Sequence, residues 1–156
     1  MSTEDPLLQH FDPQRARQPL LRAAARGTVA AMAMSGMRQL NAGLGVVERT
    51  PPQAVLEEQV PRLLRQVPAA RREAVIELAH WGYGAAAGVV FGLLPLRVRR
   101  SRLFGPIYGL TLWGVFDLAV APLLDLSYHH ESRPREQTAL LLDHALYGLI
   151  VREEQP

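Results

Sequence analysis

The chain has 156 residues, which suits one domain, and no cysteine, which excludes disulfide bonds, zinc–thiolate sites and thiol catalysis. Its formal net charge of +2 is too small for a general nucleic-acid surface, so we expect no nucleic-acid partner. All 17 basic residues are arginines, and they flank long apolar runs instead of alternating with aromatic residues. This pattern predicts a protein whose main partner is the lipid bilayer.

The N-terminal residues 1–20 are predicted to form a polar tail. They contain acidic residues and prolines but no apolar core segment, which argues against a cleavable signal peptide. A membrane domain is expected over 21–151, followed by a short C-terminal tail over 152–156. Its first span is predicted at 27–47, where Arg38 is the single charge and the length suffices at about 1.5 Å per residue.

The connection over 48–73 is long enough to hold structure of its own. Thr50 before Pro51 and Pro52 is typical of a helix start. Apolar residues then recur at intervals of four, three and four residues: Leu56, Val60, Leu63 and Val67. This spacing predicts a short amphipathic helix at the membrane interface, bent at Pro61. A loop helix packed on the bundle explains the same pattern.

Three further apolar segments follow. Residues 78–96 contain no acidic residue or arginine, and residues 103–124 contain one charge, Asp117. The last segment, 137–151, is shorter and is interrupted by Asp143 and the histidine after it, so a tilted core helix or a re-entrant segment stays open there. The predicted fold class is all-α, a membrane-spanning bundle of about four helices. A soluble bundle is the alternative, but surface helices there need a polar face.

Arginine without lysine, beside heavy use of alanine, suggests a GC-rich bacterial genome. The segment RVRRSR at 97–102 is short and close to two predicted spans, where the positive-inside rule works best. We therefore expect a multi-pass protein with this loop and both termini in the cytoplasm.

Small residues recur every four positions along the first three predicted spans, in the manner of a glycine zipper. These helix-packing candidates are Gly27, Ala31, Ser35, Gly84, Gly88, Gly92, Gly105 and Gly109. Because lipid offers no hydrophobic drive between helices, close backbone approach stabilises their association. The stripes predict tight packing, either within the chain or in a homo-oligomer or larger membrane complex.

An early small-residue span and three short motifs carry a resemblance to a known group of proteins. Pro51-Pro52, then A-H-W-G-Y-G-A-A-A-G at 79–88 and H-A-L-Y-G at 144–148, resemble small bacterial inner-membrane proteins of the YagU type over about 24–151. The resemblance implies a multi-span membrane protein without an assigned activity, and it supplies no catalytic residues. The repeated H-x-x-Y-G also hints at two related helical hairpins.

Ionisable residues inside the predicted spans form the candidate site. They are Arg38, Glu77, His80, Asp117, Asp143 and His144. Alternating helix direction places all six toward the end that carries the long connection, where the surface pair His129 and His130 also falls. Charged groups in a bilayer are costly, so each indicates a function by default. We expect Arg38 to pair with Asp117 or Asp143.

Three interpretations of this cluster stay open: a structural network of salt bridges, a site for a ligand, ion or proton, and a metal site. No tight ligand spacing supports a metal, and neither a nucleotide loop nor a G-x-S-x-G motif is present, so we expect no metal, no cofactor and no enzyme. A membrane enzyme using His80 or His144 as acid or base would lack a nucleophile. The leading hypothesis is a non-enzymatic accessory subunit or homo-oligomer acting through helix packing; the alternative is a small transporter or proton- or ion-handling protein.

Overall fold

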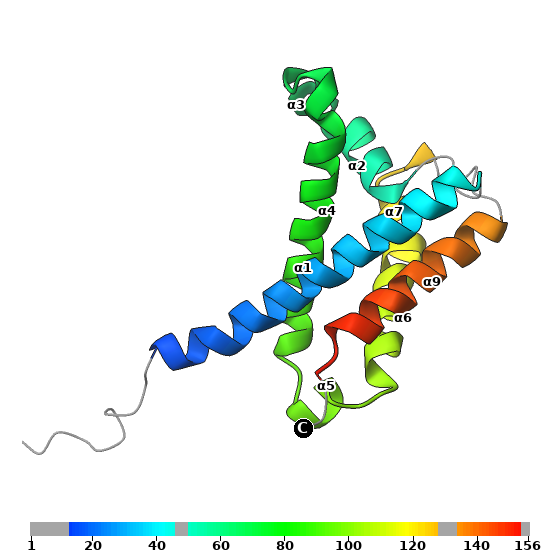
Figure 1. Ribbon diagram of the computed structural model, residues 1–156. Coiled ribbons are helices and arrows are strands. Elements are labelled where there is room, and N and C mark those ends of the chain that lie inside the picture. Colours follow the sequence, from blue (N-terminus) through cyan, green and yellow to red (C-terminus); the bar gives the residue numbers. More distant parts are fainter. Residues whose placement is uncertain (1–12, 46–49, 128–133, 154–156) are drawn as a thin grey trace, which may run out of the picture.

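The computed structural model describes residues 13–45, 50–127 and 134–153, and every regular element within them is helical (Figure 1). The all-α prediction is therefore confirmed for the described part of the chain. The first part of the predicted tail and the pair His129 and His130 lie outside it.

The first helix, α1 (Pro13–Gly43), starts well before the expected boundary at residue 27 and includes the end of the predicted tail. Between Pro13 and Arg26 the sequence is rich in arginine, glutamine, leucine and alanine, which all favour helix, and a proline suits its first position. The expected boundary followed the loss of charge, whereas the helix follows backbone propensity. The early part of α1 extends away from the bundle (Figure 1).

The long connection forms two short helices, α2 (Pro51–Gln59) and α3 (Pro61–Gln66). They are separated at Val60, which has φ −129° and ψ 46°. Pro61 causes this break, because its ring disfavours helical backbone at the residue before it and it has no N–H to donate. The bend predicted at Pro61 is therefore present.

Helix α2 packs on the bundle. Ala54 is fully buried in a cluster with Ala121, Leu126 and Leu140. Ser127 donates two hydrogen bonds to the Glu58 carboxylate, from its backbone N at 3.0 Å and from Oγ at 2.6 Å. These contacts favour the packed loop helix over an amphipathic helix that lies free at the interface.

The remaining helices are α4 (Ala69–Gly92), α5 (Leu96–Arg99), α6 (Phe104–Val115), a π-helical turn η1 (Phe116–Val120), α7 (Ala121–Leu123) and α9 (Pro134–Val151). Of these, α6, η1 and α7 follow one another without a break and form one continuous helical segment. Within the described residues, Ala69–Gly92 and Phe104–Leu123 are each long and apolar enough to cross a membrane. Phe104–Leu123 matches the predicted third span, 103–124, to within one residue at each end. Ala69–Gly92 overlaps the predicted second span, 78–96, but begins nine residues earlier and ends four residues earlier.

Helix α1 packs antiparallel on α4, and glycines set the distance between them. A Cβ atom on Gly88 would lie 2.5 Å from the carbonyl oxygen of Ala23 and 2.8 Å from Cα of Gly27. A Cβ atom on Gly84 would lie 2.5 Å from that of Ala31. The two backbones therefore touch where they cross, which only glycine permits.

The second helix pair, α6 and α9, is built in the same way. A Cβ atom on Gly105 would overlap the backbone of Gly148, and one on Gly109 would overlap the backbone of His144. All eight predicted packing residues therefore face another helix of the same chain. The glycine stripes are used inside the molecule, which removes the reason they gave for a homo-oligomer.

The bundle exposes many large apolar side chains. Leu118 exposes 77% and Leu123 85% of its area, and all four long helices contribute similar residues. Examples on the other three are Val29, Leu40, Leu78, Val90, Leu142 and Leu149. Half of the buried apolar residues in the described part of the chain are alanines, and the others are larger residues such as Phe91 and Tyr147. Large apolar residues therefore lie on the outside of the bundle as well as in its core.

Candidate functional site

An ion pair joins α1 to α4 near the end of the bundle that carries α2. The Nη2 atom of Arg38 lies 3.1 Å and 3.2 Å from the two carboxylate oxygens of Glu77. It also donates to the hydroxyl of Ser35 at 2.9 Å, and that hydroxyl contacts Glu77 as well. Arg38 exposes only 5% of its area, so its positive charge is neutralised inside the protein by Glu77.

His80 and Trp81 complete this network. Nδ1 of His80 lies 3.1 Å from Nη2 of Arg38. Since a guanidinium can only donate, Nδ1 accepts, and Nε2 of the His80 ring carries the hydrogen. Nε1 of Trp81 donates to the Ser35 hydroxyl at 3.1 Å. Side chains from one turn of α4 and from the turn of α1 that carries Arg38 therefore fix the position of its guanidinium group.

Arg38 does not pair with Asp117 or Asp143 as predicted. The antiparallel crossing at Gly27 and Gly88 brings the Arg38 turn level with Glu77 on the neighbouring helix. Helix periodicity predicts which face of each helix carries the ionisable residues, but it does not predict how α1 and α4 are aligned along their axes. The predicted pairing of Arg38 with Asp117 or Asp143 is therefore wrong.

Asp143 on α9 is the least satisfied polar group of the site. It exposes 1% of its area, and neither carboxylate oxygen has a hydrogen-bond partner among the described residues. Arg38 attracts it electrostatically from across the helix interface but is hydrogen-bonded to others. A buried, unpaired carboxylate is costly, so its retention requires a reason.

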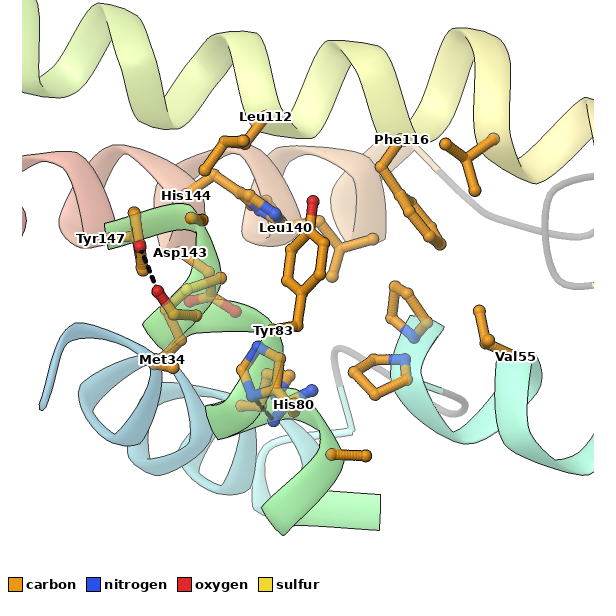
Figure 2. Close-up of a pocket in the computed structure, with 18 of the residues that line it drawn as sticks. Met34, Val55, His80, Tyr83, Leu112, Phe116, Leu140, Asp143, His144 and Tyr147 are labelled. Carbon is orange, nitrogen blue, oxygen red and sulfur yellow. Dashed lines mark hydrogen bonds between the residues drawn. The ribbon is translucent and has the colours of Figure 1, made fainter. Parts of the chain in front are cut away.

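A cavity of about 320 Å³ lies between α1, α2, α4, α6 and α9, and Asp143 is on its wall (Figure 2). Most of the wall is apolar, with side chains such as Met34, Val55 and Phe116. The ionisable residues that line it are Arg38, His80, Tyr83, Asp143, His144 and Tyr147. Figure 2 shows Asp143 pointing from α9 toward α1 and α4. An apolar cavity with a few convergent polar groups is the usual form of a small-molecule site.

His144 adds an acceptor to the same wall. Its Nδ1 lies 2.8 Å from the carbonyl oxygen of Leu140, which only accepts, so Nδ1 donates. In the neutral ring, Nε2 is then an acceptor. The hydroxyl of Tyr147, one turn further along α9, donates to the carbonyl oxygen of Gly84 at 2.7 Å and is satisfied within the protein.

Asp117 lies apart from the other five predicted residues. It is buried in the π-helical turn η1 and accepts a hydrogen bond of 3.4 Å from Nε2 of Gln137. It does not line the cavity. The structure therefore groups Arg38, Glu77 and His80 in one network, places Asp143 and His144 across the cavity from it, and leaves Asp117 outside.

Several residues of the site were missed as such by the sequence analysis. Ser35 was assigned to helix packing only, and Trp81, Tyr83 and Tyr147 were not chosen because they carry no charge at neutral pH. The repeated H-x-x-Y-G contained the signal, since both of its histidines and both of its tyrosines line the cavity. In the described residues no three histidine, aspartate or glutamate side chains are placed to hold a metal ion together.

Comparison of the chain with protein-family models, with curated proteins and with solved structures finds no match. The assignment of a function therefore depends on the geometry of the cavity and its walls.

Proposed function

We propose that this chain is a multi-pass membrane protein of four helices, and that it is a small transporter or ion-handling protein which moves protons by way of Asp143. The observation that carries the proposal is the buried Asp143 carboxylate, which lacks a hydrogen-bond partner among the described residues and lies on the wall of a cavity. Intramembrane carboxylates of this kind typically belong to ion or proton pathways.

Membrane location is supported by two helices of sufficient apolar length and by the distribution of side chains. Soluble monomers rarely expose large apolar surfaces, and all four long helices here expose several large apolar side chains. Because α1 and α9 expose apolar residues as α4 and α6 do, we propose that they span the bilayer too. The bacterial inner membrane and the likeness to YagU-type proteins are parts of the same proposal.

Orientation is supported by the distribution of arginine. Arg26 and Arg99 both contact Glu153, at 3.2 Å and 2.5 Å, so the arginine-rich segment at 97–102 gathers with the C-terminal end of α9. An arginine-rich surface at one end of a bundle favours the cytoplasm. We therefore propose that this end, with both termini, faces the cytoplasm and that α3 faces the other side.

The other hypothesis is an accessory subunit or homo-oligomer that acts through its glycine stripes. The stripes no longer support it, because they pack within the chain. The structural network of salt bridges explains Arg38 and Glu77 but leaves Asp143 without a role.

The experiment is a flux assay in proteoliposomes with an entrapped pH-sensitive dye. A membrane potential, negative inside, should drive protons into vesicles that contain the wild-type protein. Asp143→Asn should reduce this flux at least tenfold, because an amide cannot carry the proton. The matched control is Asp125→Asn, which makes the same change at an exposed residue with φ 49°, a conformation that asparagine tolerates. Equal flux through the wild type and Asp143→Asn would refute the proposal.

A further inference from the structure

The charges around the cavity do not balance. Arg38 is paired with Glu77 and contributes little net charge, and His80 accepts from Arg38 in the neutral state. When it is ionised, the buried Asp143 carboxylate therefore carries a negative charge that Arg38 attracts but that no described residue meets with a hydrogen bond. An occupant that completes the site must donate hydrogen bonds and carry positive charge.

Nε of Arg38 is a donor without a hydrogen-bond partner among the described residues, but the charge of Arg38 is paired with Glu77. The other polar atoms on the wall favour the same chemistry. Nε2 of neutral His144 and both oxygens of Asp143 are acceptors, and the two residues are adjacent on α9. Tyr83, Phe116 and Tyr147 present aromatic rings to the same cavity, and such rings attract cations electrostatically. An anionic ligand would instead meet Asp143 as a like charge, while Arg38 is already held by Glu77.

The rest of the cavity wall favours a ligand whose remaining part is apolar. Leucine, valine, proline and methionine side chains from several helices form most of its wall, and a volume of about 320 Å³ is at the lower end of small-molecule sites. A hydrated metal ion or a polar solute would lose its water there without replacement.

We infer that the cavity binds an amphiphilic amine, a compact apolar molecule with a protonated amino group, with its ammonium on Asp143 and His144 and its apolar part among Val55, Leu112 and Phe116. This inference rests on the proposed function and names its organic ligand. An ammonium group on an apolar body can come from an aminoethyl lipid of the bilayer or from a free amine in the water.

The test measures binding to the full chain in phosphatidylcholine nanodiscs by equilibrium dialysis, with empty nanodiscs subtracted. The probes are 4-phenylbutylamine, 4-phenylbutanol and 4-phenylbutyrate, which share one apolar body. The amine should bind at least tenfold more tightly than the alcohol, and the acid most weakly. Asp143→Asn should lower the affinity for the amine to that for the alcohol, whereas Asp125→Asn should leave the affinity for the amine unchanged. Tightest binding of the acid, or an amine preference that survives Asp143→Asn, would overturn the inference.

The comparison of the three probes on the wild type needs no variant and remains decisive if a variant fails to fold. Adding phosphatidylethanolamine to the nanodiscs distinguishes the two sources. Weaker amine binding there supports a lipid ammonium as the ligand, and unchanged binding supports a free amine. If Asp143-dependent proton flux is present but no amine preference is found, the inference fails and the proposed function stands.

Discussion

The hydroxyl of Tyr147 on α9 donates a hydrogen bond of 2.7 Å to the carbonyl oxygen of Gly84 on α4. Gly84 is also a point where α4 meets α1, so this bond ties the second helix pair to the first at their crossing. Tyr147 exposes only 2% of its area, and water cannot replace the lost partner.

Removing this hydroxyl should weaken the bundle. Tyr147→Phe is expected to lower the free energy of unfolding by about 1 kcal/mol, the usual contribution of such a bond. Denaturation in mild detergent with increasing dodecyl sulfate measures it. Tyr83→Phe is the control, since this half-exposed tyrosine makes no hydrogen bond to the described residues, and it should leave the midpoint unchanged. Equal effects of the two variants would contradict the assigned role.

Gly88 and Gly82 lie on the same helix, and replacing each by alanine should change the stability of the protein in opposite directions. At Gly88 the new methyl group would meet the α1 backbone at 2.5 Å, so the helix pair must separate and several kcal/mol of stability should be lost. At Gly82 nothing lies within 4 Å, and alanine should stabilise the helix by up to about 1 kcal/mol. Thermal unfolding in detergent measures both. A Gly88→Ala protein that stays folded but changes its oligomeric state would instead assign the stripe to contacts between copies.

The effects of replacing Arg38 and Glu77 on the free energy of unfolding should depend strongly on each other. Glu77→Gln leaves a buried guanidinium without its counter-charge and should cost about 3–5 kcal/mol. Replacing both residues by methionine should restore much of this loss, because no buried charge remains. Arg26→Gln, which breaks a partly exposed pair with Glu153, should cost less than about 1 kcal/mol. Additive losses in the Arg38→Met and Glu77→Met cycle would contradict a direct pair.

The absence of native cysteine makes the topology easy to measure with single cysteines. Ser101 follows α5 at one end of α4, and Gln66 ends α3 near the other end (Figure 1). A membrane-impermeant maleimide should label Ser101→Cys only in inverted vesicles and Gln66→Cys only in right-side-out vesicles. Leu118→Cys, on the apolar outer face, should need detergent. Labelling of Ser101→Cys and Gln66→Cys from the same side would exclude a spanning α4.

The sequence predicted the helices where long apolar runs leave no other option, and it failed where charge and propensity disagree. The runs at 78–96 and 103–124 correspond to helical segments because a charge-free stretch must satisfy its backbone internally. The start of α1 was missed because arginine is charged but favours helix, so the loss of charge and the helix boundary fall at different residues.

The candidate site was only partly predictable, because helix periodicity gives a face but not the register between helices. The glycine contacts that level Arg38 with Glu77 exist only after α1 and α4 have packed. Asp117 was misplaced for a second reason: it lies in the π-helical turn Phe116–Val120, where it contacts Gln137 and does not line the cavity. Neither feature has a signature in a single sequence.

Asp143 is proposed to serve a ligand or ion and not the stability of the fold. The most direct measurement is the free energy of unfolding of Asp143→Leu in mild detergent without added ligand. Because the buried carboxylate has no hydrogen-bond partner among the described residues, its replacement by an apolar side chain should stabilise the protein by about 1–3 kcal/mol. A loss of stability of the same size would show that Asp143 holds the bundle together and would contradict its proposed role in binding a ligand or ion.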